Sequence, residues 1–451
     1  MRKLFKSPDT IFKYLTAAVI MTIILYPKFP FLRIPGLQVS IRLEDFLMAA
    51  VVGICGIYLL PRLLRVFSLN IEKTILIYLV VGLLSLLSAI FITKTAGIEV
   101  GFLHWLRRIE YFAGFFLGVL ASRKRENLGF YIKILLLTLF IVFLYAAGQR
   151  YFYWPVIVTQ NVEYAKGIAL RWIPGSHINS TFAGHYDLAT FLVLVLPIFI
   201  SLFYVIKKIK TRIILGIAIS CGLWLLLVSV SRISIASYLL ASSVALLWLR
   251  KYKAILVVIG VSLIFFSFSS DLRTRYVRIF DEARKRLGEV TFYIHAQEDL
   301  PERRTNVVTP MPTPMPVLED RSSSIRLNVE WPRAIRAFSK NPLLGTGYSS
   351  ITLATDNDYL RALGETGILG LVAFSLIFIR ISEILLTKYS LIKKEFSDID
   401  KSFVAGMMGG SLGILVNALF VDVFEASKFA IIFWILIGIL VGFIRKKNYA
   451  E

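Results

Sequence analysis

The chain has 451 residues, of which 57% are hydrophobic and only 18% are charged. Soluble domains usually carry about 25% charged residues, so this composition excludes an ordinary soluble protein. The formal net charge of +22 does not indicate nucleic-acid binding, because the basic residues gather in short loops between apolar runs and not on a soluble module with interleaved aromatic residues.

Apolar runs follow one another along the chain, each close to the roughly 20 residues that an α-helix needs to cross a bilayer. They are continuous and do not alternate every second residue, which excludes a transmembrane β-barrel. We therefore predict an all-α polytopic membrane protein with about 12 spans. The runs cover residues 10–27, 44–60, 71–92, 101–121, 129–150, 186–206, 211–229, 233–249, 254–269, 359–380, 402–421 and 428–444.

Short basic loops give these spans an orientation, because loops rich in Lys and Arg stay in the cytoplasm. With Arg2, Lys3 and Lys6 inside, both termini are predicted to be cytoplasmic. The first run is a retained span, since no small-residue cleavage site precedes Pro27. The other basic loops contain Arg62 and Arg65, Arg123–Arg125, Lys207–Arg212, Arg250–Lys253, and Arg445–Lys447.

Two long segments then fall outside, where long translocated loops escape the positive-inside rule. The first is 151–185, and the second, 270–355, is a large extracytoplasmic loop between spans nine and ten. Within the second loop, Asp271–Gly288 has the pattern of an amphipathic helix and Thr309–Pro316 is a flexible or polyproline spacer. Arg326–Phe338 predicts another helix.

The segment 341–370, which leads into the tenth span, carries two turn clusters. The first, NPLLGTG, begins with Asn341-Pro342 and contains Gly345 and Gly347. The second, Asp356-Asn357-Asp358, precedes the apolar run. One of its side chains is expected to cap the helix, which leaves another to face a site. Two carboxylates alone are only a weak indication of a divalent cation.

Three glycines recur every third residue in the tenth span: Gly364, Gly367 and Gly370. They are predicted to lie along one side of the helix, where this spacing lets another helix approach closely inside a membrane. Arg361 and Glu365 lie one turn apart in the same span, so we expect them to form an ion pair.

Two arginines are candidates for holding an anion. Arg232 follows the seventh span and is flanked by Ser231 and Ser234. It either reaches toward lipid phosphates or turns inward, as ionisable groups near the bilayer usually require a cavity or partner. Arg326, on the predicted loop helix, is either solvated or part of a site.

Other polar residues have structural interpretations of equal or greater weight. The fourth span contains Arg107, Arg108 and Glu110. A structural ion pair is a better interpretation of these residues than a catalytic role. His185 and Asp187 either line a polar site or begin the sixth span, where Asp187 suits the first turn. No His or Cys spacing in the chain is typical of a metal site.

At these residues the chain resembles a known family. Asp356-Asn357, nine residues and then Gly367-Ile-Leu-Gly370 resemble the outer-loop motif of bacterial O-antigen ligases. That motif has a histidine, then Asn, Ser or Gln, nine residues, glycine, two residues and a small residue or Tyr. Asp356 stands where the ligases have histidine. O-antigen polymerases share the membrane domain and often lack the histidine, so this difference favours a polymerase.

Further pieces extend the resemblance from about Ser180 to the C-terminus. NPLLGTG is similar to the segment that precedes the motif in this family, and Arg326 with Trp331 resembles its arginine-to-tryptophan helix. Ser231-Arg232 resembles a serine–arginine span start, and NALFVDVFEASKFAIIFW resembles the end of the domain. The resemblance divides the chain into N-terminal helices, 1–180, and an O-antigen ligase-related region, 181–451.

The resemblance implies a GT-C-like glycosyltransferase in the bacterial cytoplasmic membrane, with its active site facing the periplasm or exterior. Such enzymes move a glycan from an undecaprenyl-diphosphate carrier to a hydroxyl on another carrier-linked glycan or on lipid A-core. The lipid-linked oligosaccharide is a substrate, and no metal or other cofactor is expected. Besides membrane lipids, a chain-length regulator or a flippase is a candidate partner.

Within this reaction, we expect Arg232 and Arg326 to hold the diphosphate, because a guanidinium binds phosphate oxygens in pairs and stays charged. Asp356 is the candidate base for the acceptor hydroxyl, although an ordinary aspartate, with a pKa of about 3.9, is a poor base near neutral pH. Further substrate-binding candidates are His185, Asp187 and Asn357, and the candidate structural motif comprises Gly345, Gly347, Gly367 and Gly370.

A transporter or lipid flippase is the alternative from another class. Many transporters show internal repeats with sites near the bilayer midplane, whereas the halves of this chain look dissimilar and its polar candidates cluster at outer helix ends. A scaffold partner in cell-envelope assembly is a third interpretation.

Overall fold

The computed structural model describes residues 8–27, 30–33, 40–122, 127–157, 169–173, 176–267, 325–351 and 354–445. The predicted helix Asp271–Gly288, the spacer Thr309–Pro316 and the basic residues 2–6 lie outside the described residues.

A helix coincides with every predicted span. These helices are α1 (Pro8–Leu25), α2 (Leu43–Leu59), α4 (Asn70–Phe91), α5 (Ile98–Ala121), α6 (Asn127–Tyr151), α7 (His185–Val205), α8 (Ile209–Ser229), α9 (Arg232–Trp248), α10 (Tyr252–Ser267), α14 (Asp358–Thr387), α16 (Asp398–Asn417) and α17 (Ser427–Arg445).

Short elements connect them. The predicted loop helix is a π-helical turn, η3 (Arg326–Glu330), that continues into α13 (Trp331–Lys340); α3 (Leu63–Ser68), α15 (Tyr389–Glu395) and the 3₁₀ turn η1 (Leu60–Arg62) are also present. Two small antiparallel sheets pair β1 (Pro30–Arg33) with β2 (Ser40–Arg42) and β3 (Val156–Ile157) with β4 (Ala169–Leu170).

In the described part of the chain, nine helices are long and apolar enough to cross a membrane. The predicted class, an all-α polytopic membrane protein, is therefore confirmed. Helices α9 and α10 are apolar but have only 17 and 16 residues, and α5 carries three charged residues in its middle. The total of about 12 spans and the GT-C-like arrangement stay predictions.

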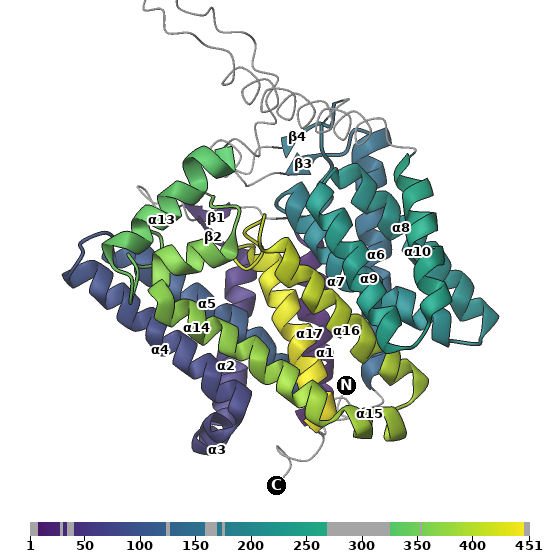
Figure 1. Ribbon diagram of the computed structural model, residues 1–451, viewed down its shortest axis with the longest axis horizontal. Helices are drawn as coiled ribbons and strands as arrows, with labels where there is room; N and C mark the ends of the chain where they lie inside the picture. Colours follow the sequence, from purple (N-terminus) through teal and green to yellow (C-terminus); the bar gives the residue numbers. More distant parts are fainter. Residues whose placement is uncertain are drawn as a thin grey trace, which may run out of the picture.

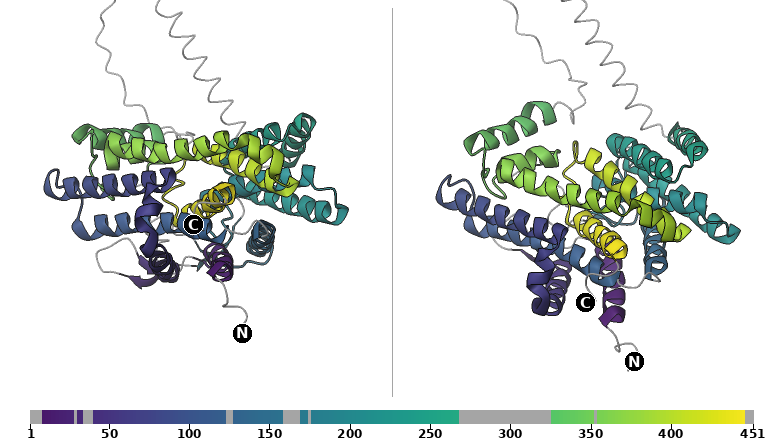
Figure 2. Two further views of the ribbon diagram at one scale, coloured as in Figure 1. Left: turned by 90° about the horizontal axis from the view of Figure 1, so that it is seen from below. Right: turned by 60° about the horizontal axis from the view of Figure 1, so that its bottom comes forward.

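Helices α7 and α17 form the centre of the bundle, because 83% and 94% of an 18-residue apolar stretch in each helix is buried. Helix α16 packs against α7 and α9, and α17 packs against α5. Figure 1 shows α13 beside the first part of α14, and both views of Figure 2 show α4 and α5 on one side of α14. The packing of α5 on α17 crosses the predicted boundary at residue 180, and the two-region division stays a prediction.

Glycine makes the α5–α17 contact possible. A Cβ atom built on Gly118 would lie 2.2 Å from the carbonyl oxygen of Ile435, and one on Gly438 would lie 2.1 Å from that of Phe115. Any larger residue would push the two backbones apart, so the α5–α17 contact depends on these small residues.

The prediction of a continuous glycine-lined helix in the tenth span is wrong. Gly367 has φ 66° and ψ −170°, a conformation that breaks α14 into two parts. The NPLLGTG turn packs into this break so closely that a Cβ atom on Gly367 would lie 2.3 Å from the carbonyl oxygen of Leu343, and one on Gly345 2.4 Å from the carbonyl carbon of Glu365. Backbone polar groups released by the break are thereby paired with the turn.

Four backbone hydrogen bonds join the NPLLGTG turn to the break. They run from the amides of Thr346 and Gly347 to the carbonyls of Gly364 and Glu365 (2.9 and 2.8 Å), and from the amides of Ile368 and Leu369 to the carbonyls of Pro342 and Leu343 (2.9 and 3.3 Å). The glycines at 345, 347 and 367 have positive φ angles of 69°, 86° and 66°, which explains why glycine occupies them. Gly370 is buried one turn beyond the break.

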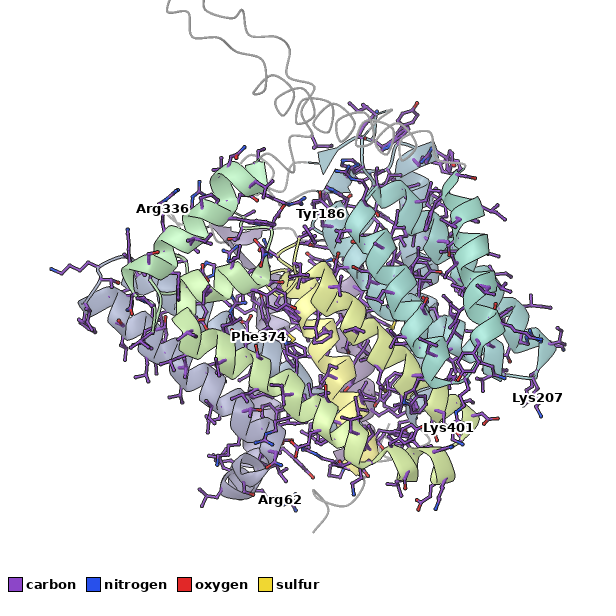
Figure 3. All side chains as sticks on the ribbon, viewed as in Figure 1. Arg62, Tyr186, Lys207, Arg336, Phe374 and Lys401 are labelled. Carbon is purple, nitrogen blue, oxygen red and sulfur yellow. The ribbon has the colours of Figure 1, made fainter. Side chains whose placement is uncertain are left out.

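Labelled residues mark the two ends of the bundle. In Figure 3 Arg62, Lys207 and Lys401 lie toward one end, which we call the basic end, and Tyr186 and Arg336 lie toward the other, which we call the cavity end. The break in α14 and the first turn of α7 lie toward the cavity end (Figure 1).

Candidate functional site

A polar cavity of about 420 Å³ is lined by Tyr186 and by charged residues from six parts of the chain. Its volume is within the range of pockets that bind small molecules. The basic lining residues are Arg42, Arg107 and Arg361, and the acidic ones are Asp187, Glu330, Asp356, Asp422 and Glu425. A cavity with both charges suits an anionic ligand and proton transfer together.

Asp422 fixes the turn that presents Asp356 to the cavity. Its Oδ2 accepts a hydrogen bond from the amide of Thr355 (2.8 Å), and its Oδ1 accepts one from the amide of Asn357 (3.1 Å). Asp356, between them, has a left-handed φ of 49°, which Asp tolerates better than most residues. Its carboxylate is thus held in one direction.

The three residues of the acidic turn cluster have separate roles. Asn357 caps α14, because its side chain accepts a hydrogen bond from the amide of Leu360 (2.9 Å), so the capping prediction is confirmed. Asp358 accepts from the amides of Val423 and Phe424 (2.7 and 3.1 Å). Only Asp356 lines the cavity, and whether Asn357 also contacts substrate stays a prediction.

Arg326 and Asp356 form an ion pair beside the cavity. Both Nε and Nη2 of Arg326 donate to Oδ2 of Asp356, at 2.9 and 2.7 Å. The Arg326 side chain is only 13% exposed, which excludes the interpretation as a solvated loop arginine. The π-helical turn at this position is a geometry often found at functional sites.

The pKa of Asp356 is raised. Burial is the largest cause, Arg326 opposes it, and the nearby carboxylate of Asp422 raises the pKa further. The raised pKa moves Asp356 toward the range of a useful base.

A second set of charges, which we call the ion-pair frame, consists of Arg108, Arg361, Glu365, Asp422 and Glu425. Arg361 lies 3.0 Å from Asp422, 3.5 Å from Glu365 and 3.8 Å from Glu425. The predicted pair of Arg361 with Glu365 is confirmed. Because the frame joins α5, α14 and the loop before α17, it holds together the elements that surround the cavity.

The structural ion pair expected in α5 has a different partner from the one its sequence neighbours suggested. Arg108 is buried and pairs with Glu425 from the loop before α17, not with Glu110. Burial raises the pKa of Glu425, but Arg108 and Arg361 outweigh it and hold the pKa below its usual range. Glu425 therefore stays ionised as part of the frame.

The first turn of α7 contributes Tyr186 and Asp187 to the cavity lining. Asp187 also occupies the favourable first-turn position, so both interpretations of this residue hold. The His185 ring contacts the rings of His177 and Tyr186 at tilted angles, with ring centroids 4.2 and 4.1 Å away. A substrate contact of His185 stays a prediction.

Arg232 begins α9, after Val230 has turned the chain with a left-handed φ of 55°. It is not among the residues that line the described cavity, and its diphosphate role stays a prediction. A chain of hydrogen bonds ties its surroundings to α16 and α7: Ser231 Oγ to Ser234 Oγ (2.7 Å), Ser234 Oγ to Asn417 Oδ1 (3.1 Å), and Asn417 Nδ2 to Thr190 Oγ1 (2.8 Å).

Several cavity residues were not among the site residues predicted from the sequence: Tyr186 and the charged residues Arg42, Arg107, Glu330, Arg361, Asp422 and Glu425. Arg107 has no ion pair within 4 Å among the residues that the structure describes, and Arg42 lies 3.7 Å from Glu44. The spacing of Glu330, four residues after Arg326 on a predicted helix, was the one available signal. The others approach the cavity from distant segments.

A comparison with protein families finds that residues 217–375 match the model described as O-Antigen ligase. The match includes the second part of α8, all of α9 and α10, Arg326 and Asp356, and the break in α14. The resemblance predicted from the sequence is confirmed for this segment, and it indicates an O-antigen ligase- or polymerase-like membrane protein. The match ends before the NALFVDVFEASKFAIIFW stretch. A comparison with curated proteins finds no match.

Proposed function

We propose that the protein is a membrane glycosyltransferase that moves a glycan from an undecaprenyl-diphosphate carrier to an acceptor hydroxyl during assembly of a surface polysaccharide. The observation that carries this proposal is the Arg326–Asp356 pair beside a polar cavity, inside the segment that matches the O-Antigen ligase family. A polymerase is preferred over a ligase to lipid A-core, because Asp356 stands where the ligase motif has histidine.

The donor already carries its leaving group, so the protein must hold a diphosphate and stabilise the charge that develops on it. Preorganised cationic donors in a water-poor site supply a large catalytic effect of this kind. Arg326 is at the cavity edge through Asp356, and Arg107 lines the cavity. We propose that these two side chains, together with Arg232, bind the diphosphate without a metal ion.

The acceptor hydroxyl must lose a proton as its oxygen attacks the sugar. Asp356 is the base predicted from the sequence and its pKa is raised, but its Oδ2 already accepts two hydrogen bonds from Arg326, which weaken it as a proton acceptor. Asp187, also on the cavity wall, is proposed to bind sugar hydroxyls, for which carboxylates are good hydrogen-bond acceptors.

An apolar cavity of about 500 Å³ supports a lipid-linked donor. It is lined by residues of α9, α14, α16 and α17, among them Trp248, Phe378 and Leu415. The hydroxyl of Tyr359, in the first turn of α14, donates to the carbonyl oxygen of Leu415 (2.7 Å), so this cavity begins close to the acidic turn cluster. We propose that the polyprenyl chain lies here, with its diphosphate at the polar cavity.

The distribution of basic residues supports an outward-facing site. Arg62, Lys207 and Lys401 lie at the basic end (Figure 3), and basic loops stay in the cytoplasm. We propose that the cavity end faces the periplasm or exterior and that both termini are cytoplasmic.

Purified full-length protein in lipid bilayers, supplied with a polyprenyl-diphosphate oligosaccharide, tests the proposal by product length. A ladder of longer lipid-linked glycans is the expected result. One-step transfer to added lipid A-core would replace polymerase by ligase. Movement of the labelled donor across the bilayer with its covalent structure unchanged would overturn the enzyme and favour a transporter.

A further inference from the structure

Most of the acidic groups on the cavity wall are already engaged with an arginine. The pairs are Asp356 with Arg326, Asp422 with Arg361, and Glu425 with Arg108. A carboxylate that receives guanidinium hydrogen bonds is stabilised in its charged form and is a weaker proton acceptor. These pairs therefore suit binding and support better than proton transfer.

Glu330 differs from these residues. It lines the same cavity, and its Oε2 atom is buried with no hydrogen-bond partner among the described residues. A buried, unsatisfied carboxylate oxygen costs on the order of 1–3 kcal/mol or more, so such atoms usually have a functional or solvent explanation. A substrate hydroxyl in the cavity would satisfy it.

The position of Glu330 fits a substrate that is bound by Arg326. Both residues belong to the single π-helical turn η3, at its two ends, so the turn carries a phosphate-binding group and a carboxylate together. Asp356, by contrast, accepts two hydrogen bonds from Arg326 at Oδ2. This geometry suits a carboxylate that orients the guanidinium.

Resting on the proposed glycosyl transfer, we propose that Glu330 is the catalytic base and that Asp356 is a positioning residue for Arg326. The acceptor oxygen forms a bond to the anomeric carbon of the donor sugar while the bond from that carbon to the diphosphate oxygen breaks. The bonding pair leaves with the lipid diphosphate, and the acceptor proton passes to the carboxylate of Glu330. Glu330 then releases the proton to water.

The charges around Glu330 support this assignment. Burial is the largest cause of a pKa raised to about 7; Asp356 and Asp422 raise it further, and Arg326 and Arg333 lower it. A pKa near the operating pH is favourable for a general base, because the ionised form is populated and still basic. The other charged cavity residues are Arg42, Arg107, Asp187, Arg361 and Glu425.

The test compares Glu330→Gln with Glu395→Gln, an exposed glutamate of α15, in the product-length assay. We expect Glu330→Gln to lower kcat by about 10²–10⁴-fold with the KM for donor lipid little changed, and the control to be unaffected. The wild-type rate should fall as pH drops through about 7, and the residual rate of Glu330→Gln should lack this acid limb. A Glu330→Gln rate near wild type, or an acid limb that persists, overturns the assignment.

Two further variants keep the test decisive if Glu330→Gln does not fold. Glu330→Asp retains a carboxylate and should retain both partial activity and an acid limb. Asp356→Asn should shift the acid limb of its residual activity to lower pH, because it removes a charge that raises the pKa of Glu330 and frees Arg326, which lowers it. An unshifted acid limb would contradict the proposal.

The assay separates the two levels of inference. If the wild-type protein makes no product from any lipid-diphosphate donor, the proposed function fails. If the wild type is active and Glu330→Gln is equally active, only the role of Glu330 fails.

Discussion

The ion-pair frame and the Arg326–Asp356 pair lie beside the same cavity but differ in how their partners are shared. In the frame, Arg361 faces three carboxylates, and Glu425 is shared with Arg108. Arg326 and Asp356, by contrast, make their ion pair with each other. An arriving diphosphate can replace Asp356 on Arg326 without disconnecting any helices. We therefore assign the shared ion pairs to the scaffold and the Arg326–Asp356 pair to the site.

Removing the central arginine of the frame should have the largest effect on the fold. Arg361→Ala leaves Asp422 and Glu365 without their arginine in a buried position, and breaking a buried pair in this way typically costs about 3–5 kcal/mol. We expect a much lower thermal unfolding temperature and little protein in the membrane. Arg336→Ala, an exposed arginine of α13, is the control. Wild-type stability in Arg361→Ala would remove the distinction between scaffold and site.

Removing the arginine of the lone pair should affect activity first. Arg326→Gln keeps a hydrogen-bond donor but loses the charge that we assign to the diphosphate, so we expect kcat to fall by about 10²–10³-fold. The unfolding temperature should change little, because Arg326 does not belong to the frame. Arg336→Gln again serves as the control, in the same assay and melting experiment. Full turnover by a folded Arg326→Gln protein would rule out its role in binding the diphosphate.

The break in α14 gives a smaller, purely structural prediction. Gly367→Ala adds a Cβ atom at a positive φ and 2.3 Å from the carbonyl oxygen of Leu343. The conformation of Gly367, with φ 66° and ψ −170°, is essentially restricted to glycine and costs roughly 1–3 kcal/mol for other residues, so thermal stability should fall by at least the lower figure. Gly53→Ala is the matched control, because a Cβ atom there meets nothing within 4 Å and alanine favours a helix. Equal stability of the two variants would show that the break tolerates an ordinary residue.

The helices could be predicted well from the sequence, because crossing a bilayer requires about 20 apolar residues in a row and such a run can be recognised without knowing the rest of the fold. The prediction failed at Gly367, since a glycine every third residue looks the same whether it lines a helix or breaks one. The parts of the site that could be predicted were those whose polar residues stand out within a short segment: Asp187 at the start of the sixth span, Arg326 on the loop helix, and Asp356 with the cap Asn357 before the tenth span. The cavity also contains Arg107 from α5 and Asp422 and Glu425 from the loop before α17. These segments are far apart in the chain, and no local pattern in the sequence indicates that they lie together.

The smallest expected effect concerns Glu425 and Glu330, whose ionisation should change the stability of the folded protein in opposite directions. The pKa of Glu425 is held below its usual value, so its contribution to stability is present above the unfolded pKa of about 4.3 and is lost as pH falls through the lower folded value. The pKa of Glu330 is raised to about 7, so its ionisation penalises the folded state increasingly from about pH 4.3 upward and fully above about pH 7.

Glu425→Gln should therefore lower the unfolding temperature at pH 8, whereas Glu330→Gln should raise it slightly at pH 8 and leave it unchanged at pH 4. Melting curves of both variants and of Glu395→Gln at the two pH values make the comparison. A loss of stability at pH 8 in Glu330→Gln would assign this residue to the scaffold. A gain at pH 8 together with lost turnover is the expected mark of a residue whose ionisation costs stability and serves catalysis.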